Sequence, residues 1–260
     1  MRKKKDNWKI WKIWKKSHCE GKMHYKRAIG KLPEMESAKA ICKILSSFYK
    51  PKMKLLDVGC GAGHYLRSIR LRLDKNIDYT GLDTTGYYIK LARKAFGKGP
   101  RFLVGDILNL PFKSGTFDIV ICCNLIVHLP PPPTKAISEL IRVAKKYVVI
   151  RTTFGETTYI IKQVQSLNKK TTDLIDQNGE PLLYGFFNMY SEQYLRNIIT
   201  KIKKNINIKI VKDDKWVTFD NRRVAGKLAT RIIDGHQVAG NLFLDWRFII
   251  LKNEKDKNRK

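Results

Sequence analysis

Residues 55–64 read LLDVGCGAGH. An apolar run ends in Asp57, and three alternating glycines follow it at Gly59, Gly61 and Gly63. Glycine reaches backbone conformations that other residues avoid, so the main chain of such a turn can come close to a ligand. The succession of strand, glycine turn and helix therefore predicts a cofactor-binding site at the carboxyl end of a buried strand.

Apolar runs and amphipathic stretches alternate outward from this turn, which is typical of an α/β fold. Strands are expected at residues 54–58, 79–83, 102–104, 117–123, 147–151, 206–211 and 243–251. Helices are expected within 33–50 and at 64–73, 87–96, 134–145 and 191–201, the last begun by Ser191 as N-cap. Strands that alternate with helices form a parallel sheet covered on both faces. The predicted architecture is a doubly wound, mostly parallel, seven-stranded sheet.

The glycine spacing separates two classes of cofactor. Dinucleotide-binding folds use G-x-G-x-x-G, whose third glycine falls where this chain has His64. The spacing G-x-G-x-G after an acidic residue instead resembles motif I of the Rossmann-like, class I S-adenosylmethionine-dependent methyltransferases. This resemblance covers residues 50–152. It implies S-adenosylmethionine as methyl donor and S-adenosylhomocysteine as product.

Further segments match the same family in the same order. The resemblance implies that Asp83, at the end of the second strand, accepts the ribose hydroxyls. It also implies that Asp106 accepts from the adenine amino group, and that Asn124 lies where methionine meets the acceptor. A helix N-cap role for Asp83 and a turn-forming role for Asp106 are the competing interpretations. The predicted cofactor-binding residues are Asp57, Gly59, Cys60, Gly61, Gly63, Asp83, Thr84, Asp106, Ile107 and Asn124.

The acceptor side is predicted from the segments after strands four and five. His128 follows the fourth strand and is expected to act as a general base, with a packing or substrate-orienting role as the alternative. The resemblance implies acceptor contacts at Thr152, Thr153, Tyr159, Tyr184, Phe186, Phe187, Asn188 and Tyr190. Segments 151–159 and 187–191 are similar to small-molecule methyltransferases of bacterial surface-polysaccharide gene clusters. The cysteines and histidines show no metal-ligand spacing, so no metal is expected.

Residues 1–50 are expected to form an N-terminal helical extension that acts as a lid. Trp8, Trp11 and Trp14 recur near helical spacing among lysines, which suits packing on the domain or, alternatively, anchoring at a membrane surface. Tyr25, Lys26 and Arg27 form a basic aromatic stretch at the place where related enzymes fold a lid over the cofactor. The resemblance implies that an Arg or Lys there pairs with the methionine carboxylate, and solvated surface charge is the default interpretation. The methyltransferase domain would then span 51–260, with a variable acceptor region at about 152–240.

The net charge and the cysteines bear on partners and location. The 260 residues carry a formal charge of +29, which attracts nucleic acid, anionic lipid or phosphorylated metabolites, although a general lysine bias would also produce it. No apolar run approaches the about 20 residues that a membrane span needs, and the N-terminus does not read as a signal peptide. The five cysteines form no disulfide framework. A cytoplasmic location is expected.

Three functions remain open at this point. The favoured one is methyl transfer to a small anionic acceptor, such as a phosphorylated or nucleotide-linked precursor of a surface polysaccharide. An RNA methyltransferase is the competing enzyme, which the positive charge favours, although the sequence has no separate RNA-binding module. The third is a protein that binds the cofactor without transferring its methyl group.

Overall fold

The computed structural model describes residues 14, 18–164, 174–213, 230–233, 235–239 and 242–253. The strands are β1 Lys54–Val58, β2 Asp78–Asp83, β3 Arg101–Val104, β4 Phe117–Cys123, β5 Ala144–Phe154, β6 Lys162–Val164, β7 Tyr184–Phe186, β8 Ile206–Lys212, β9 Arg231–Ile233, β10 His236–Ala239 and β11 Leu242–Asn253. The helices are α3 His18–Ala28, α4 Glu36–Leu45, α5 His64–Arg72, α6 Gly86–Phe96, α7 Thr134–Val143 and α8 Glu192–Ile202, with a 3-10 turn η1 at Ile126–His128. None of the helices described is long and apolar enough to cross a membrane.

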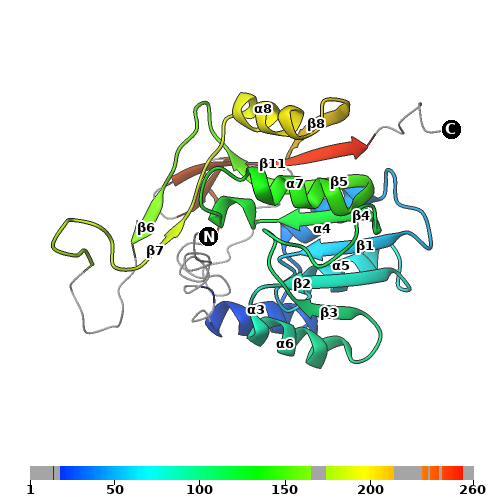
Figure 1. Ribbon diagram of the computed structural model, residues 1–260. Coiled ribbons are helices and arrows are strands. Elements are labelled where there is room, and N and C mark those ends of the chain that lie inside the picture. The colour runs from blue at the N-terminus through cyan, green and yellow to red at the C-terminus, as the bar shows by residue number, and fades with distance from the viewer. Residues whose placement is uncertain are drawn as a thin grey trace, which may run out of the picture.

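One large sheet forms the centre of the molecule (Figure 1). Its strands run in the order β3-β2-β1-β4-β5-β11-β10-β9, and β8 also pairs with β11. Strands β1 to β5 pair in parallel. Their carboxyl ends therefore meet at one edge, where crevices for ligands form in open α/β sheets.

The predicted count of seven strands is wrong, because the described sheet has nine. The two additional strands, β9 and β10, are short and pair antiparallel with each other, and β10 also pairs antiparallel with the start of β11. The rest of β11 pairs antiparallel with β5 on one side and with β8 on the other. The long strand β11 thus pairs with β5 along one edge and with β10 and then β8 along the other. The sheet therefore has both parallel and antiparallel strands.

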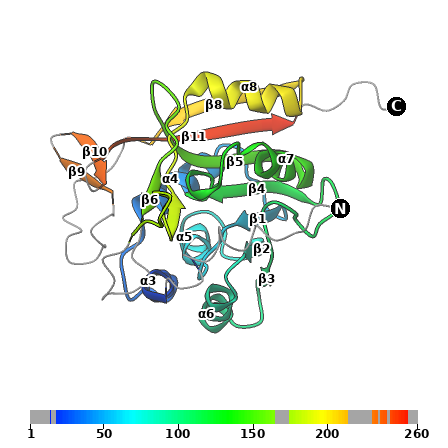
Figure 2. The same cartoon turned by 60° about the vertical axis from the view of Figure 1, so that its left-hand side comes forward.

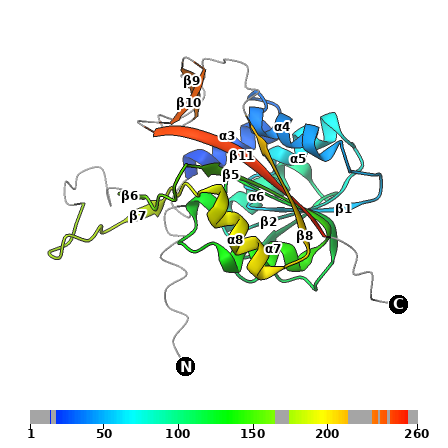
Figure 3. The same cartoon turned by 90° about the horizontal axis from the view of Figure 1, so that it is seen from above.

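Helices cover both faces of the sheet, as the alternating pattern predicts (Figure 3). Leu55, Ile119 and Val149 point into a core shared with α4, α5 and α6. Their neighbours along the strands, including Leu56 and Val120, point into a second core shared with α7 and α8. Because successive strand residues face opposite sides, each apolar run is buried on both faces.

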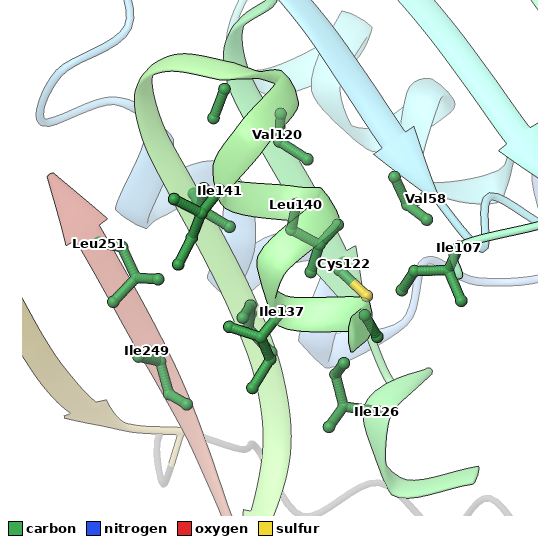
Figure 4. Packing of buried hydrophobic residues seen from close by; sticks show 14 of the residues in the cluster. Val58, Ile107, Val120, Cys122, Ile126, Ile137, Leu140, Ile141, Ile249 and Leu251 are labelled. Atoms are coloured by element: carbon green, nitrogen blue, oxygen red, sulfur yellow. The ribbon is translucent and has the colours of Figure 1, made fainter. Parts of the chain in front are cut away.

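The second core is filled by branched aliphatic side chains. Figure 4 shows Ile137 and Leu140 of α7 directed at the sheet, close to Cys122 of β4 and Ile249 of β11. Each such side chain stabilises the fold by about 1.5–3 kcal/mol when fully buried. This packing holds the carboxyl ends of the parallel strands in a fixed arrangement.

One helix boundary and one pair of strands differ from the prediction. Helix α7 ends at Val143, two residues before the predicted limit, because β5 begins directly at Ala144. Strands β6 and β7 were not predicted, because the segment 153–185 is polar and has no clear pattern. They form a two-stranded antiparallel sheet that projects from the body (Figure 1). Trp8 and Trp11 lie outside the described residues.

Candidate active site

The glycine turn joins β1 to α5 at the carboxyl edge of the sheet. Gly59, Gly61 and Gly63 have φ values of +81°, +55° and +82°, which only glycine adopts without strain. The main-chain N–H groups of Gly59 and Cys60 donate to Leu82 O at 2.7 and 3.1 Å, which fixes the turn to β2. The conformation agrees with the predicted cofactor turn.

The three glycines have different surroundings. A Cβ added at Gly61 would lie 2.9 Å from His24 Nδ1, so the main chain there faces helix α3. A Cβ at Gly63 would lie 2.7 Å from the Phe96 ring, so this glycine permits close packing of aromatic side chains. Cys60 is fully buried and its thiol lies in the core beside Gly81. A contact of Cys60 with the cofactor would therefore use its main chain.

Asp83 connects β2 to the glycine turn. Its Oδ2 accepts from Gly61 N at 3.0 Å and its Oδ1 accepts from Thr85 N at 2.8 Å. Burial raises the pKa of this carboxyl, while the two hydrogen bonds oppose the increase. The N-cap of α6 is Thr85 and not Asp83, so the competing N-cap interpretation is wrong, although the Thr85 N–H that Asp83 holds lies at the start of that helix. Each carboxylate oxygen keeps a lone pair for a ribose hydroxyl, and Thr84, half-buried, follows directly.

Asp57 lies deeper, inside the sheet. Its Oδ2 accepts from the Tyr79 hydroxyl at 2.7 Å, and only 2% of the residue is exposed. Burial raises the pKa of Asp57 to about 7 although the Tyr79 hydrogen bond lowers it. The predicted contact of Asp57 with the cofactor stays a prediction, and in this structure its partner is a neighbouring strand.

Asp106 and Ile107 follow β3. Asp106 Oδ1 accepts from Leu108 N at 2.9 Å, which is the turn-forming role proposed as the alternative. Ile107 is 2% exposed and packs in the core beneath α7. Their predicted adenine contacts stay predictions. The half-buried Asp106 is the more accessible of the two.

Asn124 ends β4 in the left-handed conformation, with φ +61°. Its side-chain oxygen accepts from the Arg151 guanidinium, and its Nδ2 donates to the Tyr65 hydroxyl at 3.4 Å. Arg151 also pairs with Asp213 at 2.6 Å and lies 4.0 Å above the Trp246 ring. Sequence reasoning missed this network. An arginine inside the apolar run of β5 was the available signal.

His128 ends η1, beside the acceptor region. Its Nδ1 donates to Phe186 O at 2.9 Å, because a carbonyl oxygen only accepts, and this leaves Nε2 as the unprotonated nitrogen. The rings of Trp14 and Phe187 lie 4.8 and 5.7 Å from the imidazole. Burial lowers the pKa of His128 to about 4, so the ring is neutral near pH 7.

The remaining predicted acceptor residues divide into two groups. Thr153 and Asn188 are fully buried and joined by a hydrogen bond of 2.9 Å from Thr153 Oγ1 to Asn188 O. Asn188 Nδ2 in turn donates to Leu129 O at 2.8 Å, which ties the loop after β4 to the end of β5. Thr152 and Tyr190 are buried too. The partly exposed group, which is open to a ligand, consists of Tyr159, Tyr184, Phe186 and Phe187.

Comparison with known proteins places this geometry in a class. Residues 56–150 match the family model of a methyltransferase domain. Norajmaline N-methyltransferase of Rauvolfia serpentina is 39% identical over 100 residues, which are 36% of this chain and 33% of the relative. Probable tRNA methyltransferase 9B of Homo sapiens is 33% identical over 96 residues, which are 36% of this chain and 19% of the relative. The chain thus spans a third or less of the length of these relatives.

The fold likeness extends over most of the chain. Magnesium protoporphyrin IX methyltransferase from Synechocystis PCC 6803, solved with bound S-adenosylmethionine, aligns with a TM-score of 0.55 and 13% identity, covering 93% of this chain and 94% of that one. The domain match over residues 56–150 and this likeness together show an α/β methyltransferase fold with a mostly parallel central sheet.

Proposed function

We propose that this chain transfers a methyl group from S-adenosylmethionine to a small anionic metabolite, such as a phosphorylated or nucleotide-linked precursor of a surface polysaccharide. The observation that carries the proposal is the approach of Asp83 to the glycine turn at adjacent strand ends, where Asp83 Oδ2 lies 3.0 Å from Gly61 N. A nucleoside seated there has a carboxylate for its ribose and, beside it, a glycine turn whose main chain carries no side chain of its own. The charge of +29 supports an anionic acceptor.

The residues around this site supply binding and orientation. S-adenosylmethionine brings an activated methyl group on a sulfonium, so no acid is needed to release the leaving group. Holding the acceptor in line with that methyl group contributes up to about 7–11 kcal/mol toward the barrier. His128 is proposed as the general base, because its Nε2 is unprotonated and available to take a proton from an acceptor hydroxyl.

The proposal also covers the roles of two regions of the chain. Residues 1–50 serve as a lid and about 152–240 as the acceptor-binding region, with α3 lying beside α5 and α6 (Figure 2).

The five cysteines all lie in described residues and none is paired, which supports a location in a reducing compartment such as the cytoplasm.

Calorimetric titration with S-adenosylhomocysteine tests whether the chain binds the cofactor. The wild-type chain is expected to bind it, and Asp83→Ala to weaken binding by about tenfold or more, as loss of a charge-assisted hydrogen bond predicts. Asp78→Ala is the matched control, since Asp78 is exposed at the other end of the same strand. A wild-type chain with no affinity for the ligand overturns the proposal.

Methyl-labelled S-adenosylmethionine tests which class of molecule accepts the methyl group. The chain is incubated with the donor and with separated small-molecule and RNA fractions of a cell extract. Label in an anionic small molecule is the expected result. Binding of the donor without label in any fraction would mean a cofactor-binding protein without transfer activity.

An RNA methyltransferase is the second candidate, since the charge of +29 favours nucleic acid and one relative is named a probable tRNA methyltransferase. For that function, affinity for RNA should fall steeply and linearly on a logarithmic scale as salt rises. Label confined to the RNA fraction would replace the small-molecule proposal.

A further inference from the structure

Two imidazoles at the glycine turn each have a buried nitrogen atom without a hydrogen-bond partner. Among the residues that the structure describes, Nδ1 of His24 and Nδ1 of His64 are buried and have no hydrogen-bond partner. His64 is only 7% exposed. A buried polar atom without a partner costs about 1–3 kcal/mol, so a ligand that satisfies both atoms gains that energy on binding.

The two rings lie together over one main-chain position. They stack with centroids 4.3 Å apart and an interplanar angle of 23°. A Cβ built at Gly61 would lie 2.9 Å from His24 Nδ1 and 3.6 Å from His64 Cε1. His24 Nδ1 therefore lies against the part of the glycine turn that has no side chain, and the His64 ring lies beside it.

Helix α3 carries His24 to this place by close packing. A Cβ at Gly21 would lie 2.5 Å from the Tyr88 ring, so glycine at this position lets α3 approach α6. His24 itself lies edge-on to Tyr88, with ring centroids 6.1 Å apart. The helix is thus seated where its imidazole reaches the turn between β1 and α5.

The position over Gly61 lies beside the carboxylate that is proposed to hold the ribose. Asp83 Oδ2 accepts from Gly61 N at 3.0 Å, so a substituent of a ribose bound at Asp83 has the glycine turn within reach. In S-adenosylmethionine that substituent ends in an α-amino acid. Helix α5 begins at His64, directly after the turn, and a helix N-terminus favours a negative group such as a carboxylate.

The charges around the two rings suit a zwitterion. Burial lowers the pKa of His24 to about 4 and that of His64 well below its ordinary value, and Arg27 lowers both further. Neutral imidazoles accept from an ammonium group without repelling it. Arg27, whose own pKa is lowered by partial burial, provides positive charge for the carboxylate, and Glu20 is the opposing charge on the same helix.

We propose that His24 and His64 hydrogen-bond the amino-acid end of S-adenosylmethionine, and that α3 completes the cofactor site by delivering His24. This inference rests on the proposed function. The inference goes beyond that function because it assigns recognition of the amino-acid end of S-adenosylmethionine, rather than of the nucleoside, to a pair of histidines from two helices.

Two ligands that differ only in this end provide the test. S-adenosylhomocysteine carries the amino acid, whereas 5′-methylthioadenosine keeps the nucleoside and thioether but lacks it. Both are titrated calorimetrically into the wild-type chain, His24→Phe and His64→Phe. Phenylalanine preserves a stacked ring and removes the nitrogen atoms.

We expect each variant to bind S-adenosylhomocysteine about tenfold more weakly, as loss of about 1.4 kcal/mol implies, and to bind 5′-methylthioadenosine like the wild type. His18→Phe is the matched control, because His18 lies on the same helix and stacks on Tyr87 at 4.5 Å but is exposed. This control should change neither affinity.

Three outcomes overturn the inference. Unchanged affinity of both variants for S-adenosylhomocysteine means that the nitrogens do not contact the ligand. Equal loss for both ligands means that the histidines act only through the fold of the turn. Binding of neither ligand by the wild-type chain removes the proposed function as well, so the two failures are distinguishable.

Discussion

At the scale of single residues, His128 illustrates how burial determines chemistry. Its Nδ1 proton is committed to Phe186 O, and burial lowers its pKa to about 4. A base acts only when unprotonated, so the fraction competent for catalysis falls as pH drops through about 4. We therefore expect the turnover rate with the identified acceptor to stay constant from about pH 8 down to about pH 5.

His128→Ala should slow turnover by about 10²–10⁴-fold and leave the affinity for S-adenosylhomocysteine unchanged. The rates are measured with saturating donor between pH 4 and pH 8. An acid limb centred on the ordinary histidine value of 6.5 would contradict the burial argument. Normal turnover by His128→Ala would contradict the assignment of the base.

At the scale of elements, helix α8 has the cap that the sequence predicts. Ser191 Oγ accepts from Tyr194 N at 3.3 Å, and Ser191 N donates to Thr158 Oγ1 at 3.1 Å. Ser191→Ala removes the capping oxygen and should lower the free energy of unfolding by about 1 kcal/mol. Urea denaturation measures the change. Ser46→Ala, at the exposed end of α4, is the control and should cost less than about 0.5 kcal/mol. Equal losses in both variants would contradict the capping role.

At the scale of the whole molecule, the Arg151 and Asp213 pair joins parts of the chain that are far apart in sequence. Arg151 extends from β5 to Asn124 after β4, while Asp213 follows β8, and both charged side chains are almost fully buried. The Trp246 ring of β11 covers the guanidinium at 4.0 Å. Asp213→Ala leaves a buried charge without this partner and should lower the free energy of unfolding by about 3–5 kcal/mol.

Thermal unfolding tests this expectation, with Tm falling by about 2–4 °C for each kcal/mol lost. The double variant Arg151→Met, Asp213→Ala should recover part of the loss, because it removes the uncompensated charge as well. Glu180→Ala breaks the exposed pair with Lys162 and should cost no more than about 1 kcal/mol. A double variant less stable than Asp213→Ala alone would show that the arginine stabilises the sheet by packing.

The sequence by itself determined the parallel core of the sheet, the glycine turn and the cap of α8. These features rest on local patterns, since the period of apolar residues, the conformational freedom of glycine and the hydroxyl of Ser191 act within a few positions of the chain. The same strand–turn–helix motif and its neighbouring strand bring Asp83 Oδ2 to 3.0 Å from Gly61 N, and the cofactor contacts of these residues stay a prediction.

Only the tertiary structure decided what surrounds that motif. The additional strand β10 pairs with the edge of the long β11 and in turn pairs with β9, and these short segments carry no pattern of their own. His24 meets His64 across 40 positions of sequence, and Arg151 meets Asp213 across 62. Contacts of this range depend on how helices and strands pack, because burial and unsatisfied hydrogen bonds arise only when distant segments come together.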